Sequence, residues 1–272
     1  MERRGGSLSA VGIGIRAPAQ TTLEASSRIE HADKVFSLVA DPIAEFWIQS
    51  LNANTESLGP LYAVGKPRRE TYAEMVKRIL DAVRADLRVC AVSYGHPGVA
   101  AYPLHESVRR ARAEGFPAEM LAGVSAEDCL FADLGVDPVA GGCCSYEATD
   151  FLVHGRTFDP AGNLVLWQVG VIAEPGFKRE DRAWNPAGVA VLTEKLLEVY
   201  PRDHEVVVYE APRLPVCDAI VERVPLARLP HAHVTPMSTL FVPPMMKAEV
   251  DETIVRRLRI RRKSRAETAG AP

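Results

Sequence analysis

The chain has 272 residues, 47% of them apolar and 25% charged, which is an ordinary globular composition and argues against extensive disorder. A formal net charge of −3 gives no field that would attract a polyanion, so we expect no nucleic-acid partner. No apolar stretch reaches the roughly 20 residues of a membrane span, and residues 1–10 lack the core of a signal peptide, so we expect a cytoplasmic protein without a membrane partner. The five cysteines form no C-x-x-C pair, and their odd number argues against a disulfide framework or a zinc ribbon.

Helical and strand-like segments alternate along the chain. A helix at 23–32 precedes an apolar run at 35–40, and apolar residues at 3.6-residue spacing from Glu70 onward predict a helix that leads into a strand at 89–93. The next expected elements are a helix at about 104–114, an apolar run at 120–124, a helix that opens at Ser125, a strand at 164–172, a helix at about 186–200 and a strand at 204–209. This alternation predicts an α/β fold with a largely parallel sheet covered on both faces.

The chain is expected to divide into four parts. Residues 1–10 are a flexible N-terminus, 11–116 an N-terminal α/β subdomain, 117–246 a C-terminal α/β subdomain, and 247–272 a basic tail expected to be disordered. The boundary is placed at Gly115-Phe-Pro117 because glycine and proline interrupt regular structure there.

Glycine-containing loops follow two predicted strands. Val11-Gly-Ile-Gly14 begins like a dinucleotide-binding fingerprint, but Ala17 stands where the third glycine belongs. Tyr94-Gly-His-Pro-Gly98 ends the strand at 89–93, and ligands of open parallel sheets lie beyond the carboxyl ends of strands, where glycine lets them approach the backbone. Taken alone, this loop is equally compatible with a ligand site and with a plain tight turn.

Several motifs, in order, resemble the tetrapyrrole-methylase superfamily of class III S-adenosylmethionine methyltransferases. They are Val11-Gly-Ile-Gly14, the G-x-P-G loop, Leu121-Ala-Gly-Val-Ser125 and Ser238-Thr-Leu-Phe-Val-Pro243. The loop carries His96 where the superfamily typically has aspartate, which disfavours a corrin or sirohaem substrate. The resemblance is closer to the borosin peptide backbone α-N-methyltransferases and covers about residues 11–245, through the motifs KPRRETY at 66–72, YGHPG at 94–98, GVSAED at 123–128, FADLG at 131–135, YEATDF at 146–151 and WQVGV at 167–171.

This resemblance implies two α/β subdomains of tetrapyrrole-methylase type with the cofactor in the cleft between them. The implied cofactor is S-adenosyl-L-methionine, and the product is S-adenosyl-L-homocysteine. The implied cofactor-binding residues are Tyr94, Gly95, His96, Gly98, Val99 and Ala100 on one side, Ser125 and Ala126 opposite, and Thr239 at the adenosine end. No metal site is expected, because His231 and His233 come without further ligands.

The resemblance also implies a catalytic cluster of Tyr62, Arg68 and Tyr72. A backbone amide nitrogen is a poor nucleophile because its lone pair is delocalised into the carbonyl, so it must lose a proton or be driven toward an imidate form before it attacks. We expect Tyr72 to accept that proton while Arg68 and Tyr62 hold the developing imidate oxygen. Without the resemblance, a surface arginine and half-buried aromatic packing explain the same residues, and Gly59 stands where the family cluster often carries another tyrosine.

The expected substrate is a separate ribosomal precursor peptide (a RiPP of the borosin type), methylated in trans, because the segment after Pro244 is short and basic rather than apolar. The resemblance further implies a homodimer, which could form a heterotetramer with two precursor chains. Two alternatives stay open: a tetrapyrrole or other small-molecule methyltransferase of the same fold, and a non-catalytic module that binds the cofactor or a peptide.

Overall fold

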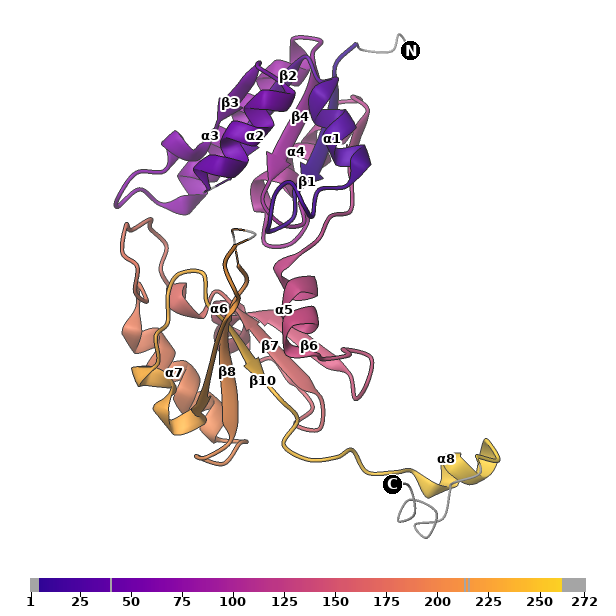
Figure 1. Ribbon diagram of the computed structural model, residues 1–272, viewed down its shortest axis with the longest axis vertical. Helices are drawn as coiled ribbons and strands as arrows, with labels where there is room; N and C mark the ends of the chain where they lie inside the picture. The colour runs from indigo at the N-terminus through magenta and orange to yellow at the C-terminus, as the bar shows by residue number, and fades with distance from the viewer. Residues whose placement is uncertain (1–4, 40, 213, 215, 261–272) are drawn as a thin grey trace.

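The protein is built on two five-stranded sheets, which lie one above the other in Figure 1. The computed structural model describes residues 5–39, 41–212, 214 and 216–260. The first sheet is entirely parallel, in the order β3 (Thr55–Ser57), β2 (Lys34–Leu38), β4 (Arg88–Ser93), β1 (Ser7–Gly12) and β5 (Ala118–Met120). The second has the order β6 (Cys143–Glu147), β7 (Asn163–Trp167), β10 (Thr239–Val242), β8 (Glu205–Glu210) and β9 (Ile220–Pro225). Only β6 and β7 pair in parallel there.

Helices cover both faces of the first sheet. On one face α1 (Leu23–Glu30) and α2 (Pro42–Leu51) pack in a cluster with Val11 and Val35. On the other, α3 (Arg68–Arg84) and α4 (Tyr102–Ala113) pack with Leu8 and Phe36. Successive residues of β1 and β2 thus enter opposite clusters, as the two-residue period of a strand requires, and both faces are apolar.

The second sheet is also covered on both faces. Helix α5 (Ala126–Leu134) packs with Val165, Val207 and Phe241 on one face. The other face carries α6 (Ala148–Val153), α7 (Pro186–Leu197) and the 3₁₀ helix Leu226–His231. Short 3₁₀ turns lie at Gly59–Leu61 and Val169–Val171, and α8 (Glu252–Arg257) extends away from both sheets at the lower right of Figure 1. None of the helices in the described part of the chain is long and apolar enough to cross a membrane.

The expected α/β class is confirmed, but four details differ from the sequence expectations. The second sheet is mostly antiparallel, since β8 returns directly into β9 without the helical crossover that parallel pairing needs. The strand expected at 164–172 ends at Trp167, because Gln168 adopts a left-handed conformation (φ +60°). Of the apolar run expected at 120–124, only Met120 belongs to a strand, and residues 121–124 form an irregular connection to α5. The helix expected at 186–200 ends at Leu197.

The first sheet uses more of the chain than the expected division gives it. Strand β1 begins at Ser7, inside the stretch expected to be flexible, and β5 pairs with β1, so this sheet extends to Met120 rather than ending at residue 116. In the expected tail, residues 252–257 form α8, whereas 1–4 and 261–272 lie outside the described residues. The five cysteines are free thiols, and burial raises the pKa of Cys143 to about 11 and that of Cys90 to about 12.

Candidate functional site

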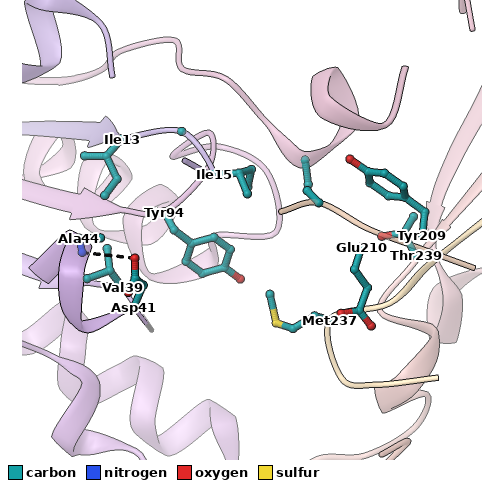
Figure 2. Close-up of a pocket in the computed structure, with 13 residues that line it drawn as sticks. Ile13, Ile15, Val39, Asp41, Ala44, Tyr94, Tyr209, Glu210, Met237 and Thr239 are labelled. Carbon is teal, nitrogen blue, oxygen red and sulfur yellow. Dashed lines mark hydrogen bonds between the residues drawn. The ribbon is translucent and has the colours of Figure 1, made fainter. Parts of the chain in front are cut away.

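A cavity lies between the two halves, with walls from both (Figure 2). The wall that belongs to the first half, which is the upper half in Figure 1 and lies at the left in Figure 2, is called the upper wall. It is formed by residues that follow β1, β2 and β4, at the edge where the carboxyl ends of these parallel strands meet. The lower wall comes from the first turn of α5, the end of β8 and the start of β10. The lining residues are Ile13, Gly14, Ile15, Val39, Asp41, Ala44, Tyr94, Ala126, Tyr209, Glu210, Ala211, Met237 and Thr239.

At the upper wall, backbone hydrogen bonds join the glycine-containing loop after β1 to the one after β4. The Gly95 N–H donates to the Gly14 carbonyl at 2.7 Å, and the Gly14 N–H donates to the Gly95 carbonyl at 3.4 Å. Both glycines have positive φ (+73° and +68°), a conformation that side chains disfavour. Gly12 allows the close approach, because a Cβ there would lie 2.0 Å from the Gly95 oxygen. The loop after β4 therefore needs its glycines for this contact as well as for any ligand.

His96 points into its own loop. Its Nδ1 accepts the Gly98 N–H at 2.9 Å, the same local turn-closing bond that an aspartate makes at such a position. Tyr94 lines the cavity, whereas Gly95, His96 and Gly98 shape the loop behind it. Val99 and Ala100 are exposed and lie outside the cavity lining, and we find no contact that brings them into it.

The predicted residues of the second half take different positions. Ala126 and Thr239 line the cavity. Ser125 is buried and caps α5: its Oγ accepts the Asp128 N–H at 3.1 Å, and its own N–H donates to the Asp128 carboxylate at 2.7 Å. These reciprocal bonds form a capping box, as the spacing predicts. The Ser125 hydroxyl is therefore already engaged by the protein.

A row of aromatic rings lies beside the cavity and contains the predicted catalytic residues. The rings of Tyr62 and Tyr72 are nearly perpendicular with centroids 6.4 Å apart, and Tyr72 lies 6.0 Å from Tyr102. Helix α3 begins at Arg68, so Arg68 and Tyr72 are one turn apart on the same face. The Arg68 guanidinium lies 5.2 Å from the Trp184 ring, within the range of a cation–π contact.

A segment of the second half holds this row in place. The Arg68 N–H donates to the Pro175 carbonyl at 2.9 Å, and the Gly65 N–H donates to the Phe177 carbonyl at 3.2 Å. The Phe177 ring lies 5.2 Å from Tyr62. The first turn of α3 and the tyrosine cluster are thus joined to both halves of the protein.

The tyrosines of the cluster differ in their acidity. Burial raises the pKa of Tyr62 well above its usual range, and the neighbouring Tyr72 and Tyr94 raise it further, while the charge of Arg68 opposes the shift. Burial between the two halves also raises the pKa of Tyr94, although 48% of this side chain is open to solvent in the cleft. Tyr72 adds to this increase in the pKa of Tyr94, and the charge of Arg68 opposes it. Tyr62 and Tyr94 are therefore neutral hydrogen-bond donors near pH 7.

Some residues of the site could not be predicted from the sequence. Phe177, Trp184, Glu210 and Met237 belong to no recognisable motif, and only the tertiary fold brings them to the cleft. Asp41 could have been found as the residue before a proline-initiated helix, and it does cap α2. The described residues contain no group of three His, Cys, Asp or Glu side chains that could hold a metal ion.

Comparisons with known proteins are consistent with this architecture. Residues 7–229 match the family model described as Tetrapyrrole (Corrin/Porphyrin) Methylases. A uroporphyrin-III-C-methyltransferase structure from Thermus thermophilus superposes with a TM-score of 0.61 at 20% identity, covering 88% of this chain and 93% of that one. A cobalt precorrin-4 methyltransferase structure gives a TM-score of 0.60 at 16% identity, covering 87% and 94%. At these identities the superpositions show the fold alone.

Curated relatives are more similar in sequence. The methyltransferase and ribosomally synthesised cyclic peptide precursor of gymnopeptides from Gymnopus fusipes is 40% identical over 263 residues, which are 95% of this chain and 62% of that protein. The corresponding omphalotin A precursor from Omphalotus olearius is 40% identical over 263 residues, covering 95% and 63%. A type III borosin precursor from Anomoporia bombycina is 42% identical over 253 residues, covering 92% and 29%. The chain spans less than two thirds of each of these relatives.

Proposed function

This chain belongs to the tetrapyrrole (corrin/porphyrin) methylase family, and from that premise we propose that it transfers methyl groups from S-adenosylmethionine to backbone amide nitrogens of a peptide. The names of the relatives at about 40% identity, which combine a methyltransferase with a cyclic peptide precursor, support a peptide substrate. The feature of the site that carries the proposal is the cluster of Tyr62, Arg68 and Tyr72 beside the cavity. A methyl transfer to a more nucleophilic atom has no need of such a cluster.

The lining of the cavity supports S-adenosylmethionine as the cofactor. Apolar side chains, among them Ile13, Val39 and Met237, offer contacts for the adenosine and the aliphatic chain, while Asp41 and Glu210 are anionic groups for a ligand that carries positive charge. The glycines at 14 and 95 leave the backbone open at the upper wall. Bound there, S-adenosylmethionine would supply an electrophilic methyl group, which the nucleophile attacks in line while the neutral thioether leaves.

The protein's own residues would then activate the amide. Tyr72, acting as the tyrosinate, would accept the proton of the peptide nitrogen, directly or through water, and leave an imidate whose negative charge resides largely on oxygen. The Arg68 guanidinium and the Tyr62 hydroxyl hold that oxygen, a role for which the raised pKa of Tyr62 suits it, since the phenol stays protonated and donates. The bonds of Arg68 and Gly65 to the segment at 175–177 fix the geometry before the peptide arrives.

The test is a mass assay on the purified protein with S-adenosylmethionine and the short peptides encoded beside its gene. We expect increments of one methyl group that fragmentation assigns to amide nitrogens. Tyr72→Phe should lower kcat by roughly 10²- to 10⁴-fold, the usual contribution of a general base, and leave the cofactor Kd unchanged. Wild-type turnover by Tyr72→Phe would refute its role, and methylation of small acceptors alone would refute the peptide substrate.

The source of the peptide and the oligomeric state remain predictions. If a separate precursor is the substrate, the methyl groups appear on the added peptide, whereas methyl groups on the enzyme chain itself would contradict action in trans. A homodimer should sediment as such at micromolar concentration, and added precursor should shift it to the mass of a heterotetramer. A monomer that retains full activity would exclude both assemblies as functional requirements.

A further inference from the structure

The cavity contains a carboxylate that the mechanism above does not use. Glu210 is the last residue of β8, and its Oε1 accepts hydrogen bonds from the hydroxyls of Thr235 and Ser238, both at 2.6 Å. Bonds this short are typical of hydroxyl donors to an ionised carboxylate. Ser238 is fully buried, and its Oγ in turn accepts the Thr235 N–H at 2.8 Å. The fold therefore holds one oxygen of Glu210 rigidly through two neighbours.

The other oxygen of Glu210 has no partner in the described part of the chain. None of the lysine, arginine and histidine side chains that the structure describes forms an ion pair with this carboxylate, and Figure 2 shows the side chain reaching into the space beside Met237. Asp41 faces the cavity from the upper wall, and its two oxygens accept the N–H groups of Ile43 and Ala44 at 3.0 and 3.3 Å. Among the described residues, the lining contains these two carboxylates and no basic side chain.

This charge pattern distinguishes the two forms of the cofactor. S-adenosylmethionine carries a positive sulfonium, whereas S-adenosylhomocysteine has a neutral thioether and is otherwise alike. An uncompensated carboxylate in a partly enclosed cavity stabilises the first by a Coulombic contribution that the second cannot receive. Resting on the function proposed above, we propose that Glu210 is a specificity-determining residue, which favours the positively charged cofactor over its neutral product and so promotes product release after each transfer.

Equilibrium binding tests this inference without turnover. Titration calorimetry would compare S-adenosylmethionine, S-adenosylhomocysteine and sinefungin, in which an ammonium replaces the methylated sulfonium. For Glu210→Gln we expect the affinity for the two cationic ligands to fall roughly 2.5- to 100-fold, the range for unit charges about 6–8 Å apart at an effective dielectric constant of about 20–80. Affinity for S-adenosylhomocysteine should change less than about two-fold, because the neutral thioether lacks that contribution.

A matched control lies on the same strand. Glu205→Gln removes the same charge at the opposite, exposed end of β8, where Glu205 pairs with Arg223, and should leave all three affinities unchanged. Thr235→Val keeps the charge but removes one anchoring hydroxyl, so it should reduce the preference for the cationic ligands by a smaller factor. This variant keeps the test decisive if Glu210→Gln fails to fold.

The outcomes separate the inference from the proposed function. An equal loss of affinity for all three ligands in Glu210→Gln would show that Glu210 contacts a group that the ligands share, such as the ribose. That result would overturn the inference that Glu210 favours the cationic cofactor. Unchanged affinities would overturn it as well. If the wild-type protein bound none of the three, the proposed function itself would fail, whereas binding without discrimination would refute only the role of Glu210.

Discussion

Gly12→Ala is expected to damage both the stability and the cofactor site, because this glycine lies where the two loops of the upper wall meet. The new Cβ would stand 2.0 Å from the Gly95 oxygen and 2.8 Å from Pro97 Cδ, and the nearer of these atoms is backbone that cannot rotate away. Overpacking of this kind costs about 1–3 kcal/mol. Separation of the loops also weakens the two hydrogen bonds between Gly14 and Gly95, at about 1 kcal/mol each. The free energy of unfolding should thus fall by about 2–5 kcal/mol.

Urea denaturation measures the loss of stability, and calorimetric titration with S-adenosylmethionine measures the effect on the cavity, where Gly14 and Tyr94 would be displaced. Gly59→Ala is the matched control, because Gly59 has no positive φ and a Cβ there meets only the Ser57 Oγ at 3.4 Å. The control should lose little stability and retain its cofactor affinity. Wild-type stability and affinity in Gly12→Ala would refute the view that this contact organises the site.

Three further predictions follow from the contacts of other residues. Ser125→Ala and Asp128→Ala each remove one half of the α5 capping box, so both should lower the stability in urea by about 1 kcal/mol. Tyr200→Phe removes a buried hydroxyl without a hydrogen-bond partner and should raise the stability by about 1 kcal/mol at neutral pH. Because burial raises the pKa of Tyr200 to about 12 from 10.0, the wild type should lose further stability relative to this variant between pH 10 and 12 in pH-resolved thermal melts. Tyr62→Phe should reduce kcat by roughly 10²- to 10³-fold with an unchanged cofactor Kd in single-turnover assays.

The sequence predicts the first half of the fold better than the second. Apolar periodicity locates α3, and the apolar run at 89–93 locates β4, because both elements pack into a continuous core and their patterns are local. The antiparallel pairing of β10 between β7 and β8 depends on residues far apart in the chain, and no local pattern specifies it. The turn at Gln168 is hidden in an apolar run, since only its positive φ interrupts the strand.

The sequence likewise predicts only part of the candidate site. Motifs predict the loop at 94–98 and the cap at Ser125, because both depend on short-range bonds between neighbouring residues. They do not reveal that His96 closes its own turn through Nδ1, or that Val99 and Ala100 lie outside the cavity lining. The first depends on the side-chain rotamer of His96 within its own loop, and the second depends on how the loop is placed against the cavity. Neither property can be read from the order of the residues.

The row of aromatic rings beside the cavity depends on contacts between the two halves of the protein. Tyr72 belongs to α3, yet the row that contains it continues through Tyr62 to Phe177 and Trp184 of the second half, and Arg68 lies over Trp184. Rings that touch across the cleft exclude water from one side of the cluster, and this burial keeps the Tyr62 phenol neutral. The fork of N–H groups of an arginine that lies over an indole ring can still bind an oxyanion. In the mechanism proposed above, the two halves must therefore be together before the cluster has the acid–base properties that amide activation would need, and the same contacts would enclose the proposed cofactor site.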